Sequence, residues 1–342
     1  MSRRTLAHRH AASAVLLLSL IALLLTTSVA HASYPGRNGK IAFTFSDPGF
    51  FRATTVNTIN PDGTDRGELS SLGGAYEPAW SPDGSKLAFA QFDLLDAPIQ
   101  VVDRDGHLLA TLFGPGFQGQ PERGYAYSPT WSPDGTQVVY YWFDASGLVT
   151  SGIYESSLAG PPRLLFARSF ALLSWSPDGS KIALNSGGTL SVMNADGSGN
   201  VTLTGQAECR CAFGNAPDWS PDSKRLAFTS DRAGQNDVYV IDVATGHEER
   251  LTSSPASDFD PTWSPDRHRI AFISNRGGQP ELYVMHAHGQ DQRRLTFGEG
   301  SQASLTNTTW QSRQAEPGGS GLGGLEARGQ PVHPLKPESV LR

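Results

Sequence analysis

Trp175-Ser176-Pro177-Asp178-Gly179-Ser180-Lys181-Ile182-Ala183-Leu184 is one copy of a unit that recurs along the chain. Further copies begin at Trp80, Trp131, Trp219 and Trp263, and a truncated copy ends at Trp310. Successive tryptophans are therefore 51, 44, 44, 44 and 47 residues apart. A repeat of this length is typical of an array of supersecondary units. Within each unit, Ser, Pro, Asp and Gly favour a type I turn, and the apolar run after them favours a strand.

The fifth and sixth repeats each carry four strand signals. They fall at residues 217–220, 225–230, 237–242 and 249–252, and at residues 261–264, 269–274, 281–285 and 293–296. Four short antiparallel strands in about 44 residues are typical of one blade of a β-propeller. The sequence therefore predicts an all-β fold of four-stranded blades.

The two ends of the repeat array complement each other. The stretch from Gly39 to Phe43 aligns with the second strand of a repeat, so the opening repeat lacks its tryptophan strand. The stretch from Asn307 to Trp310 is a tryptophan strand with nothing after it. Joining the two fragments gives a sixth blade and removes two exposed sheet edges. We expect a six-bladed propeller in which Trp310 lies beside the strand that begins near Ile41.

The repeated motif resembles that of a known family. The pattern Pro-x-Trp-Ser-Pro-Asp-Gly-x-x-Ile/Leu-Ala-Phe, with Ser230-Asp231-Arg232 and Leu282-Tyr283-Val284-Met285, is similar to the TolB-type propeller repeat over about residues 36–312. TolB itself carries a separate α/β domain before its propeller, for which this chain has no room. The resemblance implies a propeller that presents its surface to a protein or peptide.

The first 32 residues have the pattern of a signal peptide. Arg3, Arg4 and Arg9 form a basic start, a 12-residue apolar run follows, and Ala30-His31-Ala32 offers a cleavage site. The apolar run is shorter than the roughly 20 residues that span a bilayer, so we expect no membrane anchor after cleavage. This predicts an exported protein, periplasmic, secreted or attached to the cell envelope, with a propeller at residues 33–312. Residues 313–342 are rich in Gly and Pro and read as a disordered tail.

The charge of the mature chain argues against a nucleic-acid partner. Without the three arginines of the signal segment, 24 of the 27 Lys and Arg residues remain against 33 Asp and Glu residues, a net charge of −9. Phosphate contacts need concentrated Lys and Arg. We therefore set nucleic-acid binding aside. The resemblance to TolB-type propellers implies a protein or peptide ligand, and we expect the chain to be a monomer.

The repeated residues have structural explanations. One tryptophan per repeat, at a fixed strand position, indicates packing between blades rather than a stacking site for a ligand. The repeated carboxylates suit the turn better than catalysis, since Asp often accepts hydrogen bonds from a turn backbone. They are Asp83, Asp134, Asp178, Asp222 and Asp266.

The direction of the strands sorts the loops onto two rims. Short turns share one rim, while the longer loops between second and third strands and the crossovers between blades share the other, which we call the long-loop rim. Variable loops on a rigid scaffold usually carry function. The candidate binding residues lie near the expected channel mouth on that rim: Tyr76, Glu77, Tyr127, Ser128, Phe170, Phe213, Asp218, Phe259, Asp260 and Asn307. Their rings and carboxylates could bind a ligand; alternatively, the aromatic residues pack against their own crossovers.

Other chemistry is weakly represented. The sequence has no Gly-x-Ser-x-Gly nucleophile motif, so we assign no catalytic residue. Three histidines are more typical of exposed turns than of a metal site: His268, His286 and His288. We therefore assign no metal ligands and no cofactor. A structural cation in the channel, held by Asp residues, is compatible with the sequence. Cys209 and Cys211 are candidates for a local disulfide, favoured by export. The rival function is an enzyme that processes carbohydrate or peptide with carboxylates at the mouth.

Overall fold

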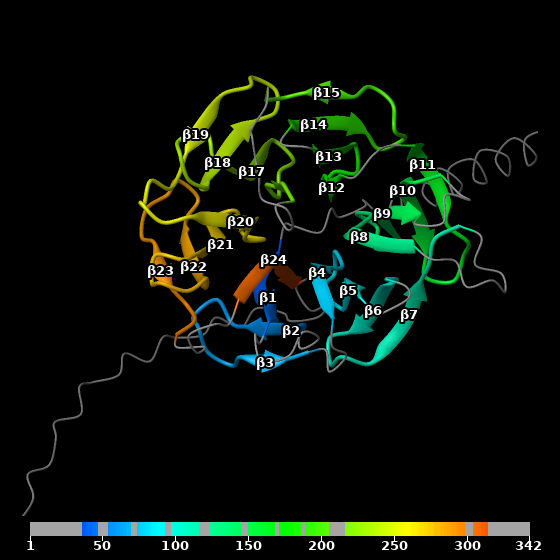
Figure 1. Cartoon of the computed structure of the whole chain (residues 1–342), viewed down its shortest axis with the longest axis horizontal. Coiled ribbons are helices and arrows are strands. Elements are labelled where there is room, and N and C mark those ends of the chain that lie inside the picture. The colour runs from blue at the N-terminus through cyan, green and yellow to red at the C-terminus, as the bar shows by residue number, and fades with distance from the viewer. Residues whose placement is uncertain are drawn as a thin grey trace, which may run out of the picture.

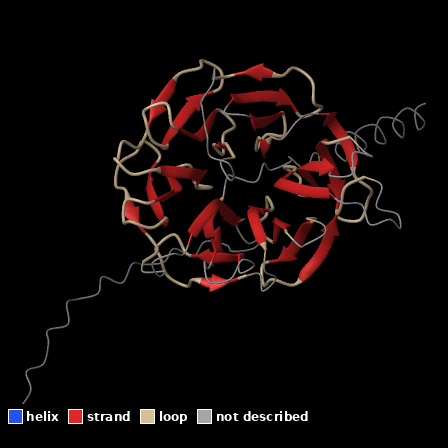
Figure 2. Cartoon of the chain, viewed as in Figure 1, coloured by secondary structure: helices blue, strands red, loops and turns tan. Residues whose placement is uncertain are grey.

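The computed structural model describes residues 36–46, 54–69, 74–92, 97–115, 124–144, 150–167, 171–186, 189–204, 216–297 and 304–313. These residues form six four-stranded antiparallel sheets set around a central axis (Figure 1). All regular structure in the described residues is strand (Figure 2), and no helix among them could cross a bilayer. The predicted six-bladed all-β propeller is confirmed. The predicted signal segment, Cys209, Cys211 and residues 314–342 lie outside the described residues.

The blades follow chain order from the innermost to the outermost strand, except that the last strand of the chain is the innermost of blade one. Blade one contains β24 (Ser304–Arg313), β1 (Arg37–Ser46), β2 (Thr54–Ile59) and β3 (Gly67–Glu68). Blade two contains β4 (Ala75–Trp80), β5 (Lys86–Gln91), β6 (Ile99–Asp103) and β7 (Leu108–Leu112). Blade three contains β8 (Gly124–Trp131), β9 (Gln137–Asp144), β10 (Gly152–Ser157) and β11 (Arg163–Ala167). Blade four contains β12 (Leu172–Trp175), β13 (Lys181–Ser186), β14 (Thr189–Asn194) and β15 (Val201–Thr202). Blade five contains β16 (Asp218–Trp219), β17 (Arg225–Ser230), β18 (Asp237–Asp242) and β19 (Glu248–Arg250). Blade six contains β20 (Asp258–Trp263), β21 (Arg269–Ser274), β22 (Glu281–His286) and β23 (Arg293–Arg294).

The last strand closes the ring. Strand β24 pairs antiparallel with β1, and Trp310 lies opposite Ile41 as predicted. The indole Nε1 of Trp310 also donates a hydrogen bond of 3.2 Å to the carbonyl oxygen of Gly39. Blade one is thus built from both ends of the propeller sequence, so the ring holds itself closed.

The repeated Ser-Pro-Asp-Gly segments form the predicted turns. In blade four, Asp178 Oδ1 accepts hydrogen bonds from Ser176 Oγ at 2.7 Å and from the backbone N–H of Ser180 at 2.9 Å. Partial burial acts to raise the pKa of Asp178, but these hydrogen bonds hold it below its ordinary value. Gly179 has a φ of +76°, a conformation that glycine adopts without strain. Asp178 is therefore a turn residue, as the sequence suggests.

The repeated tryptophans pack between neighbouring blades. Trp131 of blade three is 3% exposed and lies in one cluster with Ala88 and Val101 of blade two. Its Nε1 donates to the carbonyl oxygen of Ala79 in blade two at 3.0 Å. All six repeat tryptophans are at most 9% exposed, which confirms their structural role.

The innermost strands of three blades begin earlier than predicted. In blade two the pairing of β4 with β5 skips from Tyr76 to Ala79, because a bulge at Glu77-Pro78 interrupts it. Proline has no N–H to donate to the ladder, so it occupies a bulge readily. Similar interruptions occur at Ser128-Pro129 and Asp260-Pro261. Consequently Tyr76, Tyr127 and Phe259 lie within inner strands, not before them, and β8 occupies the end of the predicted crossover from Gly114 to Ser128.

Candidate functional site

A narrow cavity on the propeller axis is lined by the innermost strands of all six blades. It offers about 80 Å³ to the centres of water-sized molecules, enough for a few waters or one side chain. The lining consists of residues near each repeat tryptophan: Glu77, Pro78, Ala79, Ser128, Pro129, Thr130, Leu172, Leu173, Ser174, Ala216, Pro217, Asp218, Asp260, Pro261, Thr308 and Thr309. Four predicted binding residues, Glu77, Ser128, Asp218 and Asp260, are thus brought together here.

Glu77 projects from the bulge of β4 and connects blades two and three. Its Oε2 accepts a hydrogen bond of 2.6 Å from the backbone N–H of Ser128, and no described residue donates to its other oxygen. Burial raises the pKa of Glu77 to about 7, against the lowering effect of the Ser128 N–H. Glu77 keeps some accessible surface, but that surface faces the narrow channel rather than bulk water. An ionised Glu77 is therefore poorly solvated.

Asp218 makes the corresponding connection between blades five and six. Its Oδ2 accepts hydrogen bonds from the backbone N–H of Trp263 at 2.7 Å and from Thr262 Oγ1 at 3.1 Å. Burial raises the pKa of Asp218 to about 7, and these hydrogen bonds act in the opposite direction. Asp218 and Glu77 belong to blades on opposite sides of the ring (Figure 1). The two carboxyls with raised pKa values therefore come neither from one blade nor from two neighbouring blades.

The three residues that interrupt the inner strands have left-handed backbones. Glu77, Ser128 and Asp260 have φ values of +54°, +52° and +52°. Such a conformation costs a non-glycine residue about 1–2 kcal/mol. Contacts between blades hold it: Ser128 Oγ accepts from the N–H of Leu173 at 2.7 Å, and the Asp260 N–H donates to Thr229 Oγ1 at 3.2 Å. These residues both fasten the ring and line its channel.

The charges of the lining favour a positive ligand. Among the described residues that line the cavity, the ionisable ones are Glu77, Asp218 and Asp260, and none is a lysine, arginine or histidine. Carboxylates in a confined site attract cations and hydrogen-bond donors. The channel can therefore accept a cationic side chain or a chain terminus.

The remaining predicted site residues fall into two groups: those whose contacts the structure describes and those whose side chains lie outside the described part of the chain. Tyr76 lies at the edge of the Phe92 ring with centroids 5.3 Å apart, and its hydroxyl lies 2.9 Å from Thr54 Oγ1. Phe259 packs against the core between blades six and one, as the alternative interpretation proposed for the aromatics. Phe170 and Phe213 lie outside the described residues, and Asn307 is described only as a backbone position in β24.

Sequence reasoning missed three rings near Tyr127. Phe92 follows β5, Tyr125 belongs to β8 and Phe143 to β9. Phe92 stacks on Tyr125, which stacks in turn on Phe143, with centroids 6.0 and 6.4 Å apart. One signal in the sequence could have indicated two of these rings: Phe92 and Phe143 are 51 residues apart, the same interval as between Trp80 and Trp131.

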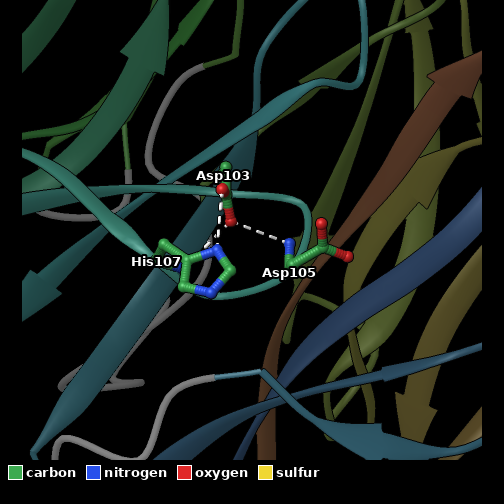
Figure 3. Close-up of side chains that lie close together, drawn as sticks. All are labelled: Asp103, Asp105 and His107. Carbon is green, nitrogen blue, oxygen red and sulfur yellow. Dashed lines mark hydrogen bonds and ion pairs between the residues drawn. The ribbon is translucent and has the colours of Figure 1, made fainter.

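One group of described side chains has the spacing of metal ligands, namely Asp103, Asp105 and His107 (Figure 3). Their ligand atoms lie within 4.8 Å of one another in the exposed turn between β6 and β7. Asp103 already accepts hydrogen bonds from the backbone N–H groups of Asp105 and His107, both at 2.9 Å, which explains the cluster as a turn. By contrast, no described metal-ligand group contains His268, His286 or His288.

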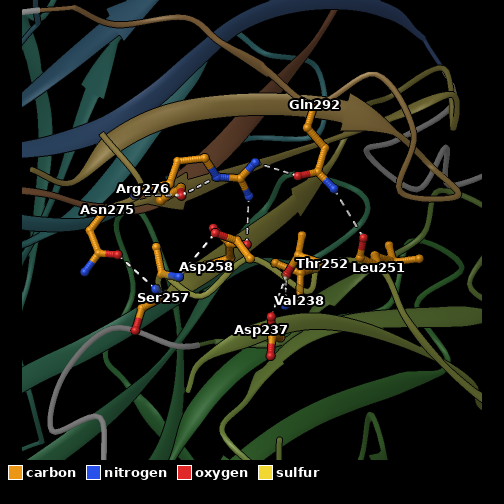
Figure 4. A network of polar contacts seen from close by, with 12 residues as sticks. Asp237, Val238, Leu251, Thr252, Ser257, Asp258, Asn275, Arg276 and Gln292 are labelled. Carbon is orange, nitrogen blue, oxygen red and sulfur yellow. Dashed lines mark hydrogen bonds and ion pairs between the residues drawn. The ribbon is translucent and has the colours of Figure 1, made fainter. Parts of the chain in front are cut away.

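Another buried carboxylate, Asp258, belongs to a hydrogen-bonded network that joins blades five and six. Arg276 lies between Asp258 and Gln292, with hydrogen bonds of 2.8 and 2.7 Å (Figure 4). Gln292 Nε2 reaches the carbonyl oxygen of Leu251 in blade five at 3.4 Å. Asp258 is fully buried and its charge is matched by Arg276. The network is structural and lies apart from the residues that line the channel.

The sequence of the second half of the ring matches a described family. Residues 174–314 match the TolB beta propeller domain. Over these residues the chain is similar to TolB-type propellers. The Tol-Pal system protein TolB of Xylella fastidiosa is 39% identical over 64 residues, which cover 19% of this chain and 14% of that protein. TolB of Alcanivorax borkumensis is 32% identical over 124 residues, 34% of this chain and 25% of that protein.

A solved structure extends the similarity to the whole ring. The crystal structure of TolB from Acinetobacter baumannii superposes with a TM-score of 0.61 and 21% identity, covering 80% of this chain and 66% of that one. At this identity the likeness establishes the fold. The matched segments of this chain span about a seventh to a quarter of the length of the two sequence relatives named above.

Proposed function

We propose that this TolB-like propeller is an exported, non-catalytic binding module that presents its long-loop rim and channel mouth to a segment of a peptide or protein. The observation that carries the proposal is the acidic channel, whose described lining contains Glu77, Asp218 and Asp260 and no basic residue. A lysine, an arginine or an N-terminal ammonium entering it would gain electrostatic energy in a poorly solvated site. A cavity of about 80 Å³ suits one side chain of an extended segment rather than a folded element.

The environment of the carboxylates supports binding over catalysis. Glu77 and Asp218 each accept a hydrogen bond from the inner strand of the next blade, so both have a structural partner. Neither carboxyl is a cause of the other's raised pKa, so the two do not form a coupled acid and base pair.

Affinity capture from the exported fraction tests the binding role. The mature protein is compared with a Glu77→Gln/Asp260→Asn variant, with a variant lacking residues 117–122 of the crossover between blades two and three, and with an exposed control, Glu68→Gln. We expect the double substitution in the channel and the deletion in the crossover each to reduce capture of the same partner. The control Glu68→Gln should capture as much of that partner as the parent protein does. If capture is indifferent to both changes, the rim is not the binding surface. Sequencing the N-terminus of the exported protein tests cleavage after Ala32.

One observation favours an enzyme as the second candidate. The raised pKa values of Glu77 and Asp218, both about 7, are suitable for proton transfer near neutral pH. Incubation with defined mixtures of peptides and oligosaccharides, followed by mass spectrometry, tests this candidate. Products that form with the parent protein and are lost in both Glu77→Gln and Asp218→Asn would favour it over a pure binding role.

A further inference from the structure

Three rings of blades two and three form a continuous row, which we call the aromatic row: Phe92, Tyr125 and Phe143. Both contacts in the row are nearly parallel, with interplanar angles of 24°. Phe143, at the end of the row, has 45% of its surface exposed. A stacked row with an exposed end ring can accept one more flat or ring-shaped group.

Folding does not require phenylalanine at two of these positions. Phe92 and Phe143 each stand six residues after the first residue of the second strand of their blade. The same place is occupied by Asp231 in blade five and by Asn275 in blade six. Because polar residues serve there in the same fold, the exposed Phe143 has a cost in solvation that packing does not explain. Phe143 does not stand alone, because it continues the row of the partly exposed Phe92 and Tyr125, and a contiguous apolar patch of this kind indicates an interaction surface.

Tyr127 joins the aromatic row to the acidic channel. Its ring centroid lies 5.4 Å from that of Phe92 and 6.4 Å from that of Tyr125. Burial raises the pKa of Tyr127 to about 12, and the charge of Glu77 contributes to the rise. Tyr127 directly precedes Ser128, whose backbone N–H donates to Glu77, so Tyr127 lies between the aromatic row and Glu77.

Building on the proposed binding role, we infer that the aromatic row and Glu77 together recognise one short segment of a partner protein that carries an aromatic or proline ring and, a few residues away, a lysine or arginine. The ring stacks on Phe143, and the cation enters the channel toward the carboxylate oxygen of Glu77 that has no described donor. The carboxylates of the lining complement that cation. Tyr125 and Tyr127 lie between the two subsites, so the ring and the cation belong to separate residues of an extended segment rather than to adjacent side chains.

Selection from a phage library of random octapeptides tests this preference. The immobilised targets are the mature protein, Phe143→Ser, Glu77→Gln and Leu108→Ser. Leu108 is the matched control, since it is 55% exposed on the outermost strand β7, away from the channel. We expect the mature protein and the control to enrich peptides that carry a ring together with Lys or Arg a few residues away. Phe143→Ser should lose the enrichment of the ring and Glu77→Gln that of the cation.

Calorimetry with one enriched peptide gives the magnitude. Loss of one ring contact at Phe143 should weaken Kd about 2- to 10-fold, with Leu108→Ser unchanged. Circular dichroism melting shows whether Phe143→Ser is folded; if it is not, Phe92→Ser is tested in its place. The preference is overturned if Lys or Arg is enriched without a ring, a result that leaves the binding role intact. Enrichment independent of both positions, or binding of oligosaccharide in place of peptides, overturns it as well. If no peptide is enriched at all, the proposed peptide-binding role fails with it.

Discussion

Replacing Glu77 with Gln should stabilise the protein at alkaline pH and leave its stability unchanged at acidic pH. Glutamine keeps a side-chain oxygen that can accept the hydrogen bond from the Ser128 N–H, but it carries no charge. In the folded protein the pKa of Glu77 is raised from 4.5 to about 7 by burial. In the unfolded chain the carboxyl titrates near its ordinary pKa, so between these two values the folded state holds the proton more tightly.

The sign of the effect follows from proton linkage. Because the folded state binds more protons between pH 4.5 and about 7, the stability contributed by protonated Glu77 is lost as pH rises through this range. A pKa difference of this size corresponds to about 3 kcal/mol at 1.36 kcal/mol per tenfold change. Water in the channel screens the charge, so about 3 kcal/mol is an upper limit for the gain of Glu77→Gln above pH 8.

Urea denaturation followed by tryptophan fluorescence, repeated from pH 5 to 8.5, measures this difference. The exposed substitution Glu68→Gln in β3 is the control and should follow the parent protein at every pH. The difference between Glu77→Gln and the parent should be about a quarter of its full size at pH 5 and grow toward pH 8. A difference that does not change with pH, or a variant less stable than the parent at pH 8, would refute the assignment of a desolvated carboxyl to this position.

Four further changes test the ring itself. Trp175→Ala should reduce the free energy of unfolding by about 3–5 kcal/mol, as for other buried aromatics, and an unchanged melting curve would contradict its core position. Gly84→Ala should cost about 2–4 kcal/mol, because its φ is +66° and a Cβ would lie 2.0 Å from the carbonyl oxygen of Ser312. Gly246→Ala, with a φ of +70° and no atom within 4 Å of the added Cβ, should cost only about 1 kcal/mol by the same denaturation assay. Removing residues 304–342 deletes the closing strand, so amide exchange in β1 should accelerate strongly; protection equal to that of the full chain would show that closure by β24 is dispensable.

Local chemistry explains why so much of the ring could be predicted from the amino-acid sequence. The Ser-Pro-Asp-Gly turn and the strand after it are set by residues that are neighbours in the chain, as the contacts of Asp178 with Ser176 and Ser180 illustrate. The spacing of the tryptophans then gives the number of blades, and the incomplete first and last repeats predict the pairing of Trp310 with Ile41.

The arrangement of the channel residues could not be predicted from the sequence, because it depends on contacts between residues of different blades. Pairing of Asp218 with Trp263 joins residues of different blades, and it forms only because the ring brings their inner strands together. The raised pKa of Glu77 likewise results from burial that exists only in the closed ring. Phe92 and Tyr125 are distant in sequence and stack because neighbouring blades converge at the channel mouth. The repeat thus determined the scaffold by itself, whereas curvature and closure of the whole ring decided which side chains meet inside it.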